Sequence, residues 1–256
     1  MFLTIIYIGI HYEDKLQDIK TYKTLPSTLN ETDEITFVQG GDIGYTDASR
    51  QLTNNLITWQ PSVIFMGGDI TYDNGMVSCY HTWDNLLSMF ETFNTASNVL
   101  IPIVLAVGNH DLSMNSLASV SYRKGKHTPL ILQYFPQHYD NYSKPSVPSV
   151  ASRLTYFVHH FANISFFSLD SGFAVSYRGE QLDFIDAEMK KFNKTKKFAQ
   201  YHVPIYSPCM GDTHDKTSNM ESLYFWSSIF DKYEVSAVFE NHDHLRKRTH
   251  PLKGIM

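Results

Sequence analysis

A repeated rhythm of short apolar runs, each followed by glycine and polar residues, most constrains the fold of this chain. The runs are rich in β-branched and aromatic residues, which favours strands buried in a sheet. They lie at residues 35–39, 62–66, 101–107, 155–161, 164–169, 198–203 and 235–239. Apolar side chains that recur at every third or fourth position predict helices at 47–59, 82–93, 180–192 and 219–232. Strands alternating with helices indicate an α/β domain with covered sheets, and Asp47 suits the N-cap of the first helix.

Five of the apolar runs end in clusters of acidic, amide, phenol or imidazole side chains. The clusters read GGDIGYTD, GGDITYDNG, GNHD, HVP and ENHDH in chain order. In an open α/β sheet, the functional site lies beyond the carboxyl ends of the strands. We therefore expect these clusters to converge in space, although they are far apart in the sequence.

The side chains in these clusters are suitable metal donors. They are Asp42, Asp69, Tyr72, Asn109, His202, His242 and His244. Oxygen and imidazole donors of this kind suit a hard or borderline divalent or trivalent ion. Seven donors are too many for one tetrahedral centre, but they suit two metals that share a bridging carboxylate. The pair His242 and His244 alone would also fit a solvated loop, so the other clusters carry the argument.

Length and composition narrow the class of protein. A chain of 256 residues, 43% of them hydrophobic, suits one large domain. The net charge of −5 disfavours a general nucleic-acid binder, which needs a basic face. The sequence has no apolar run of about 18 residues, so we expect no membrane span. The opening MFLTIIYIGI predicts a strand rather than a signal peptide, because no basic residue precedes the apolar stretch.

Cysteines and sequons bear on the compartment. Cys79 and Cys209 could form one bridge or remain two buried free thiols, and the sequence leaves both open. N-x-S/T sequons begin at Asn30, Asn141, Asn163 and Asn193. Four sequons lean mildly towards a secreted or lumenal protein.

The order of the polar clusters resembles that of the calcineurin-like metallophosphoesterases. The shared order is GD, GDxxY, GNH[DE], HxP and HxH, and the tyrosine in the second motif is similar to purple acid phosphatases. Further agreement comes from LDSG at 169–172, GEQLDFI at 179–185 and RT at 248–249. The resemblance implies a four-layer αββα sandwich of two mixed sheets flanked by helices, in the α/β (α+β) class. Residues 31–256 would form this catalytic domain, and residues 1–30 would be the stub of a fibronectin-like β-module.

The resemblance also implies a ligand set for two metal ions. The first ion would be Fe(III), held by Asp42, Asp69, Tyr72 and His244. The second would be Fe(II), Zn or Mn, held by Asp69, Asn109, His202 and His242, with Asp69 as the bridge. Most members place a histidine two residues after the first aspartate, where this chain has Gly44, and Tyr72 can fill that gap.

The implied reaction is hydrolysis of a phosphate monoester, of the acid phosphatase type, by attack of a metal-held hydroxide. His110 would protonate the leaving alcohol or hold the phosphate, and Asp111 would orient His110. The partner would be a small phosphorylated substrate, with no nucleic acid and no membrane involved, while the oligomeric state stays open. The resemblance places such a protein in a secreted, lysosomal or vacuolar lumen.

Departures from the family pattern leave alternatives open. Asn241 replaces the usual glycine before HxH, and Arg246 replaces an aromatic residue. Members normally add strands beyond the point where this chain stops at Met256, so we expect a truncated domain. A phosphodiesterase or nucleotide pyrophosphatase on the same scaffold is one alternative. A non-catalytic relative that binds metal, phosphate or a partner protein is the other.

Overall fold

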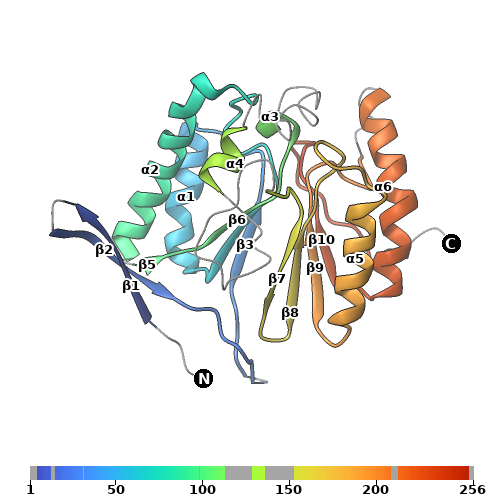
Figure 1. The fold of residues 1–256 in the computed structure, drawn as a ribbon, viewed down its shortest axis with the longest axis horizontal. Helices are drawn as coiled ribbons and strands as arrows, with labels where there is room; N and C mark the ends of the chain where they lie inside the picture. Colours follow the sequence, from blue (N-terminus) through green and yellow to red (C-terminus); the bar gives the residue numbers. More distant parts are fainter. Residues whose placement is uncertain are drawn as a thin grey trace.

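The computed structural model of the chain describes residues 5–12, 15–30, 32–97, 99–112, 129–135, 153–208 and 213–253. Two sheets stand face to face at the centre of the fold, and helices cover the outer side of each (Figure 1). The strand runs and the helices expected from the sequence are present, with ends shifted by a few residues.

The first central sheet has the strand order β3-β4-β6 and is parallel throughout its described strands. Its strands are β3 (Phe37–Gly40), β4 (Val63–Met66) and β6 (Ile103–Leu105). Helix α1 (Asp47–Trp59) connects β3 to β4, and α2 (Tyr80–Ser97) lies between β4 and β6. Two mixed sheets were expected, but among the described strands the first sheet is parallel, because each connection is a helical crossover that returns the chain in the same direction.

The second central sheet has the order β10-β9-β8-β7 and is mixed, since β7 runs antiparallel to β8 while the other pairs are parallel. Its strands are β7 (Phe157–Phe161), β8 (Ile164–Ser168), β9 (Lys196–Gln200) and β10 (Ala237–Phe239). Helices α5 (Glu180–Lys191) and α6 (Thr213–Lys232) lie on its outer face (Figure 1).

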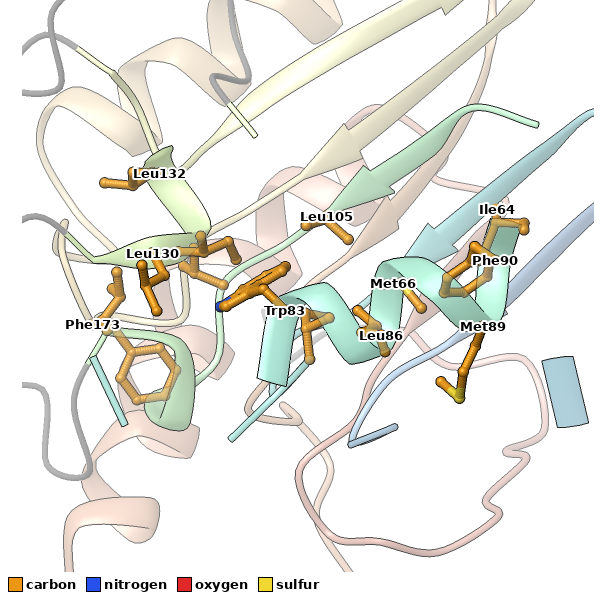
Figure 2. Close-up of a cluster of buried hydrophobic side chains, with 14 of the residues drawn as sticks. Ile64, Met66, Trp83, Leu86, Met89, Phe90, Leu105, Leu130, Leu132 and Phe173 are labelled. Carbon is orange, nitrogen blue, oxygen red and sulfur yellow. The ribbon is translucent and has the colours of Figure 1, made fainter. Parts of the chain in front are cut away.

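Three apolar clusters hold the four layers together. One lies between the two sheets, where the rings of Phe65 and Phe166 stack with their centroids 3.5 Å apart. A second lies between the first sheet and α2, and Figure 2 shows Trp83, Leu86 and Phe90 at its centre. The third joins the second sheet to α5 and α6, with Trp226 completely buried. The layers therefore follow the order helix, sheet, sheet, helix.

Shorter elements complete the described chain. They are β1 (Ile5–Tyr12), β2 (Lys15–Lys23), η1 (Val77–Cys79), β5 (Val99–Leu100), α3 (Asn109–Leu112) and α4 (Leu130–Tyr134). Strands β1 and β2 form an antiparallel hairpin, and β2 also pairs in parallel with β5. The hairpin thus shares a sheet with a strand that follows α2 (Figure 1). Its likeness to a fibronectin-like module, and the domain boundary at residue 30, stay predictions.

The first helix has the expected bounds, 47–59, but its N-cap is Thr46 rather than Asp47. The Thr46 hydroxyl accepts from the backbone N–H of Ser49, and the Ser49 hydroxyl accepts from the N–H of Thr46. This reciprocal pair satisfies two donors at the helix start, and Asp47 then places its charge in the first turn, where the helix dipole favours it.

The contact between the sheets predicts a large effect of truncation at Phe166. This ring is completely buried and also contacts Phe37, Phe198 and Phe239, so Phe166→Ala leaves a cavity between both sheets. We expect the free energy of unfolding to fall by about 3–5 kcal/mol in urea denaturation. The control Tyr224→Ala, at a side chain 77% exposed on α6, should change stability by no more than about 0.5 kcal/mol. Equal effects of the two substitutions would contradict the packing described above.

Candidate metal centre

The predicted donors lie where strands of both sheets end. Asp42 follows β3, Asp69 follows β4, and Asn109 opens the short helix α3 after β6. His202 follows β9, and His242 follows β10. Because the sheets pack face to face and these strands are parallel within each sheet, their carboxyl ends form one rim.

The turns that carry the donors have an unusual backbone. Five of the predicted donors have positive φ angles: Asp42 (53°), Asp69 (51°), Tyr72 (57°), His242 (71°) and His244 (50°). A left-handed conformation costs a residue with a Cβ about 1–2 kcal/mol. Such strain is typical of functional sites, where the surrounding structure holds a side chain in a required direction.

Three donor atoms lie around Nε2 of His202. It lies 3.1 Å from Oδ1 of Asn109, 3.2 Å from Nδ1 of His242 and 3.4 Å from Oδ2 of Asp69. Asp69, His202 and His242 form a group whose ligand atoms all lie within 4.8 Å of one another. These four residues are the set predicted for the second metal. The structure brings them together, and their role as ligands stays a prediction.

His202 is oriented for metal binding. Its Nδ1 lies 3.0 Å from the carbonyl oxygen of Gly67, which can only accept, so Nδ1 carries a proton and Nε2 is the nitrogen that faces the other donors. Burial lowers the pKa of His202, but the carboxylate of Asp69 outweighs burial and raises the pKa to about 9. A cation at Nε2 would supply the positive charge that the neighbouring carboxylates attract.

A second meeting point joins Asp42, Tyr72 and His244. Nε2 of His244 lies 3.0 Å from the Tyr72 hydroxyl and 3.2 Å from Oδ1 of Asp42. Oδ2 of Asp42 accepts the backbone N–H of His242, whereas the buried Oδ1, although close to His244, accepts no hydrogen bond of suitable geometry from the described residues. A buried carboxylate oxygen without a donor fits a site built for a cation. The residues therefore fit the first metal of the predicted pair.

The charges around the Tyr72 phenol also fit a cation at this site. Burial, followed by the negative charges of Asp42 and Asp69, raises the pKa of the Tyr72 phenol above its ordinary value. The hydroxyl therefore keeps its proton unless a strong cation binds beside it. A bound metal ion reverses this preference, because it is the largest charge in its site.

Asp69 faces His202 in the first meeting point, and its charge also acts on Asp42 and Tyr72 in the second. Its Oδ1 accepts the backbone N–H of His110 at 2.9 Å, and its Oδ2 faces His202. Burial raises the pKa of Asp69, but the hydrogen bond and charge of His202 outweigh burial, so the pKa is below its ordinary value. Asp69 therefore stays ionised, as a bridging ligand requires.

Asp111 supports the Asp69 turn. Its completely buried carboxylate accepts backbone N–H groups from Asp69, Ile70 and Gly108 at 2.7–2.8 Å. The expectation that Asp111 orients His110 is wrong, because its oxygens are used to fix the loops on either side of the site.

Asn74 holds the ring of His110 instead. Its Oδ1 lies 2.5 Å from Nδ1 of His110, and its backbone N–H donates to the carbonyl of His110. Nε2 of His110 then faces the site, 3.9 Å from Oδ2 of Asp69. Sequence reasoning missed Asn74, and the available signal was its place in the turn-forming DNG stretch directly after Tyr72.

Asn241 replaces the usual glycine without crowding its turn. Its side chain packs against Gly41 and Gly67, and a Cβ on Gly67 would lie 1.8 Å from Nδ2 of Asn241. Nδ2 also donates to the carbonyl of Tyr201 at 3.1 Å. Gly41 and Gly67, one glycine from each GG pair, therefore make room for Asn241, which ties the turns of the first sheet to the second.

The LDSG motif supports the His202 turn. The Ser171 hydroxyl, which is completely buried, accepts the backbone N–H groups of both His202 and Val203 at 3.0 Å. Of the two cysteines, Cys79 forms no disulfide with another described residue, and Cys209 lies outside the described residues. Whether they pair stays open.

The chain belongs to the calcineurin-like phosphoesterase family, whose model matches residues 13–246. This is a family of hydrolytic, metal-dependent phosphoesterases, so the class of protein and its general chemistry are defined.

The individual relatives share little sequence identity with this chain. The chain is 21% identical to purple acid phosphatase 18 of Arabidopsis thaliana over 84% of its own length and 45% of the relative's. Its fold is similar to that of purple acid phosphatase PPD1 from yellow lupin (Lupinus luteus) seeds, with a TM-score of 0.63, 15% identity and coverage of 89% of this chain and 40% of that one. It is also similar to a dimetal phosphatase from Danio rerio, with a TM-score of 0.50, 14% identity and coverage of 82% of each chain. The chain spans about half the length of the curated relatives that it matches.

Within the described part of the chain, each helix is too short or too polar to serve as a membrane span.

The packing of Asn241 against Gly67 predicts a rescue experiment. Gly67→Ala should lower the affinity for metal at least tenfold, because the new methyl group displaces Asn241 and the turn before Asp69. In the double variant Gly67→Ala/Asn241→Gly, the nearest obstructing atoms are gone and most of the affinity should return. Calorimetric titration with metal measures the affinity of both variants. A double variant as weak as Gly67→Ala would show that Asn241 is not what excludes a side chain there.

Proposed function

We propose that this chain hydrolyses phosphate monoesters at a pair of metal ions, with the chemistry of an acid phosphatase. The observation that carries the proposal is the convergence of donor atoms from both sheets on one rim, with His110 beside them. The names of the relatives, purple acid phosphatase and dimetal phosphatase, support the same activity.

The proposed first ion is Fe(III), held by Asp42, Asp69, Tyr72 and His244. A phenolate and two carboxylates are hard, anionic donors, which suit a trivalent ion. The proposed second ion is Fe(II), Zn or Mn, held by Asp69, Asn109, His202 and His242. Two imidazoles, an amide and one carboxylate carry less charge, which suits a divalent ion.

When bound, the two ions would supply an activated water and neutralise charge on the phosphate oxygens. The protein's own part in the reaction falls to His110. Because Asn74 accepts the proton on Nδ1, Nε2 of His110 points towards the site. In its imidazolium form, which carries a proton on each ring nitrogen, His110 donates the Nε2 proton to the departing alcohol oxygen, or a hydrogen bond to the phosphate. Its side chain is 29% exposed, which leaves it accessible to a substrate.

The proposed partner is a small phosphorylated substrate, rather than nucleic acid or a membrane. We also propose that the protein is secreted or acts in a lysosomal or vacuolar lumen. The sequon asparagines Asn30, Asn163 and Asn193 are exposed, which supports that location, while Asn141 lies outside the described residues.

Tyr72→Phe tests the assignment of iron to the first site. The purified chain supplied with iron and zinc should hold about two metals per chain and show a broad visible band from the phenolate–iron bond. Tyr72→Phe should lose this band, because it removes the oxygen that lies 3.0 Å from Nε2 of His244. Metal analysis and an absorption spectrum measure both quantities. A colourless, active protein with two zinc ions would refute Fe(III) at Tyr72 and leave the dinuclear site intact.

Substitution of His110 tests the function itself. The metal-loaded chain should hydrolyse phenyl phosphate, and His110→Asn should lower kcat about 10²- to 10⁴-fold without loss of metal. Asn74→Ala should lower kcat about tenfold and shift its pH profile, whereas Asn74→Asp keeps an acceptor for Nδ1 and should retain most activity.

The same assay separates the alternatives. Diphenyl phosphate as a second substrate distinguishes a monoesterase from a diesterase. Faster hydrolysis of the diester would replace the monoester assignment. Two bound metals with no hydrolysis of either ester would identify a non-catalytic relative.

A further inference from the structure

A cavity of about 710 Å³ lies directly beside the first metal site. Asp42, Tyr72 and His244, three of the proposed ligands, form part of its wall. The rest of the wall comes from β3, from the turn after it, from α1 and from the buried faces of β4 and α2. Its volume is typical of a small-molecule pocket, so it can hold an organic group attached to a phosphate at the metals.

The wall of this cavity is apolar where it leaves the metal site. Val38, Leu56, Met66 and Phe90 line it, and Figure 2 shows Met66 and Phe90 in the core between β4 and α2. Among the described lining residues, Asp42 is the one with a carboxylate. Beyond Asp42, the cavity therefore presents surface that prefers hydrocarbon to water.

The hydroxyl groups in the wall are already hydrogen-bonded within the protein. Thr46 and Ser49 cap α1 reciprocally, and Thr53 donates to the carbonyl of Ser49. Thr71 donates to the carboxylate of Asp73 at 3.1 Å. These hydroxyl groups already have partners and offer few hydrogen bonds to a ligand. Recognition in the cavity would therefore depend on burial of apolar area.

The surface at Leu52 extends this apolar wall to solvent. The Leu52 side chain lines the cavity and is 63% exposed, and Tyr45 beside the metal turn is 39% exposed. The aromatic ring of Tyr72 lies between the cavity and His110, with its centroid 4.9 Å from that of His110. An organic group that enters past Tyr72 therefore keeps its ester oxygen close to the proposed proton donor.

We infer that this cavity is the subsite for the apolar part of the substrate, an alkyl chain or aromatic ring attached to the phosphate. The inference rests on the proposed function for the position of the phosphate. It names the substrate class as phosphate esters of apolar alcohols, rather than sugar phosphates, whose hydroxyl groups would find few free partners in this wall.

A series of n-alkylphosphonates tests this inference without chemistry. Calorimetry with the chain supplied with iron and zinc should give a Kd that falls about three- to fourfold for each methylene added from methyl to hexyl. Leu56→Trp, which fills the cavity, should abolish the dependence on chain length and leave methylphosphonate binding unchanged. A Kd independent of chain length in the unaltered protein would overturn the subsite.

Surface variants guard against misfolding of Leu56→Trp. Leu52→Asp places a charge at the exposed end of the cavity and should weaken hexylphosphonate about tenfold while sparing methylphosphonate. The matched control Met220→Asp changes a side chain that is 71% exposed on α6 and should alter neither. An unchanged affinity for hexylphosphonate in Leu52→Asp would also count against the subsite.

Hydrolysis distinguishes this inference from the proposed function. Chain-length dependence without hydrolysis of phenyl phosphate would reject the phosphatase and keep the apolar subsite. Hydrolysis without chain-length dependence would reject the subsite and keep the phosphatase.

Discussion

Packing of the two central sheets against each other determines where the site can form. The stacked rings of Phe65 and Phe166 lie between the sheets, so the strands that follow them end at neighbouring places on one rim. Neither sheet supplies the full set of donors alone, since Asp69 follows a strand of the first sheet and His202 follows a strand of the second. Asn241 reinforces this junction, because it packs against glycines of the first sheet while it bonds to the backbone of the second.

The turns that form this rim are locally unfavourable in the protein alone. Five of its donor residues have left-handed backbone, and Asp42 buries an oxygen without a donor. Burial also raises the pKa of Asp42, which shows that its charge is poorly compensated by the protein alone. A cation relieves this arrangement directly, because it supplies both the missing partner and the missing charge. The same features that disfavour the turns in isolation therefore favour metal binding.

The sequence predicts most of this architecture, because strand composition, helical periodicity and the polar ends of strands are local signals. Asp42, Asp69 and His202 could be assigned to one rim before the fold was known, since parallel strands end together. The partnership of Asn74 with His110 and the packing of Asn241 against Gly67 could not be assigned in this way. Both depend on the positions of residues far apart in the chain, and neither leaves a periodic pattern.

The incorrect expectations have the same origin. Asp111 is next to His110 in the sequence, which suggested that it orients the histidine, but the short helix α3 turns its carboxylate towards the backbone of the Asp69 turn. The first sheet was expected to be mixed because the family pattern was applied to both sheets, whereas α1 and α2 make each of its connections a crossover.

Under the proposed function, the site and the cavity beside it would divide substrate recognition between two kinds of force. Metal ions held by the charged donors at the rim would attract the phosphate, and this attraction would be common to every phosphate ester. In the cavity, Leu56, Met66 and Phe90 offer burial of apolar area, which depends on the size of the organic group. Tyr72 belongs to both, since its hydroxyl faces His244 and its ring lines the cavity. Under the proposal, a change at Tyr72 would therefore affect metal and substrate together, whereas a change at Leu56 would separate selectivity for the organic group from affinity for the phosphate.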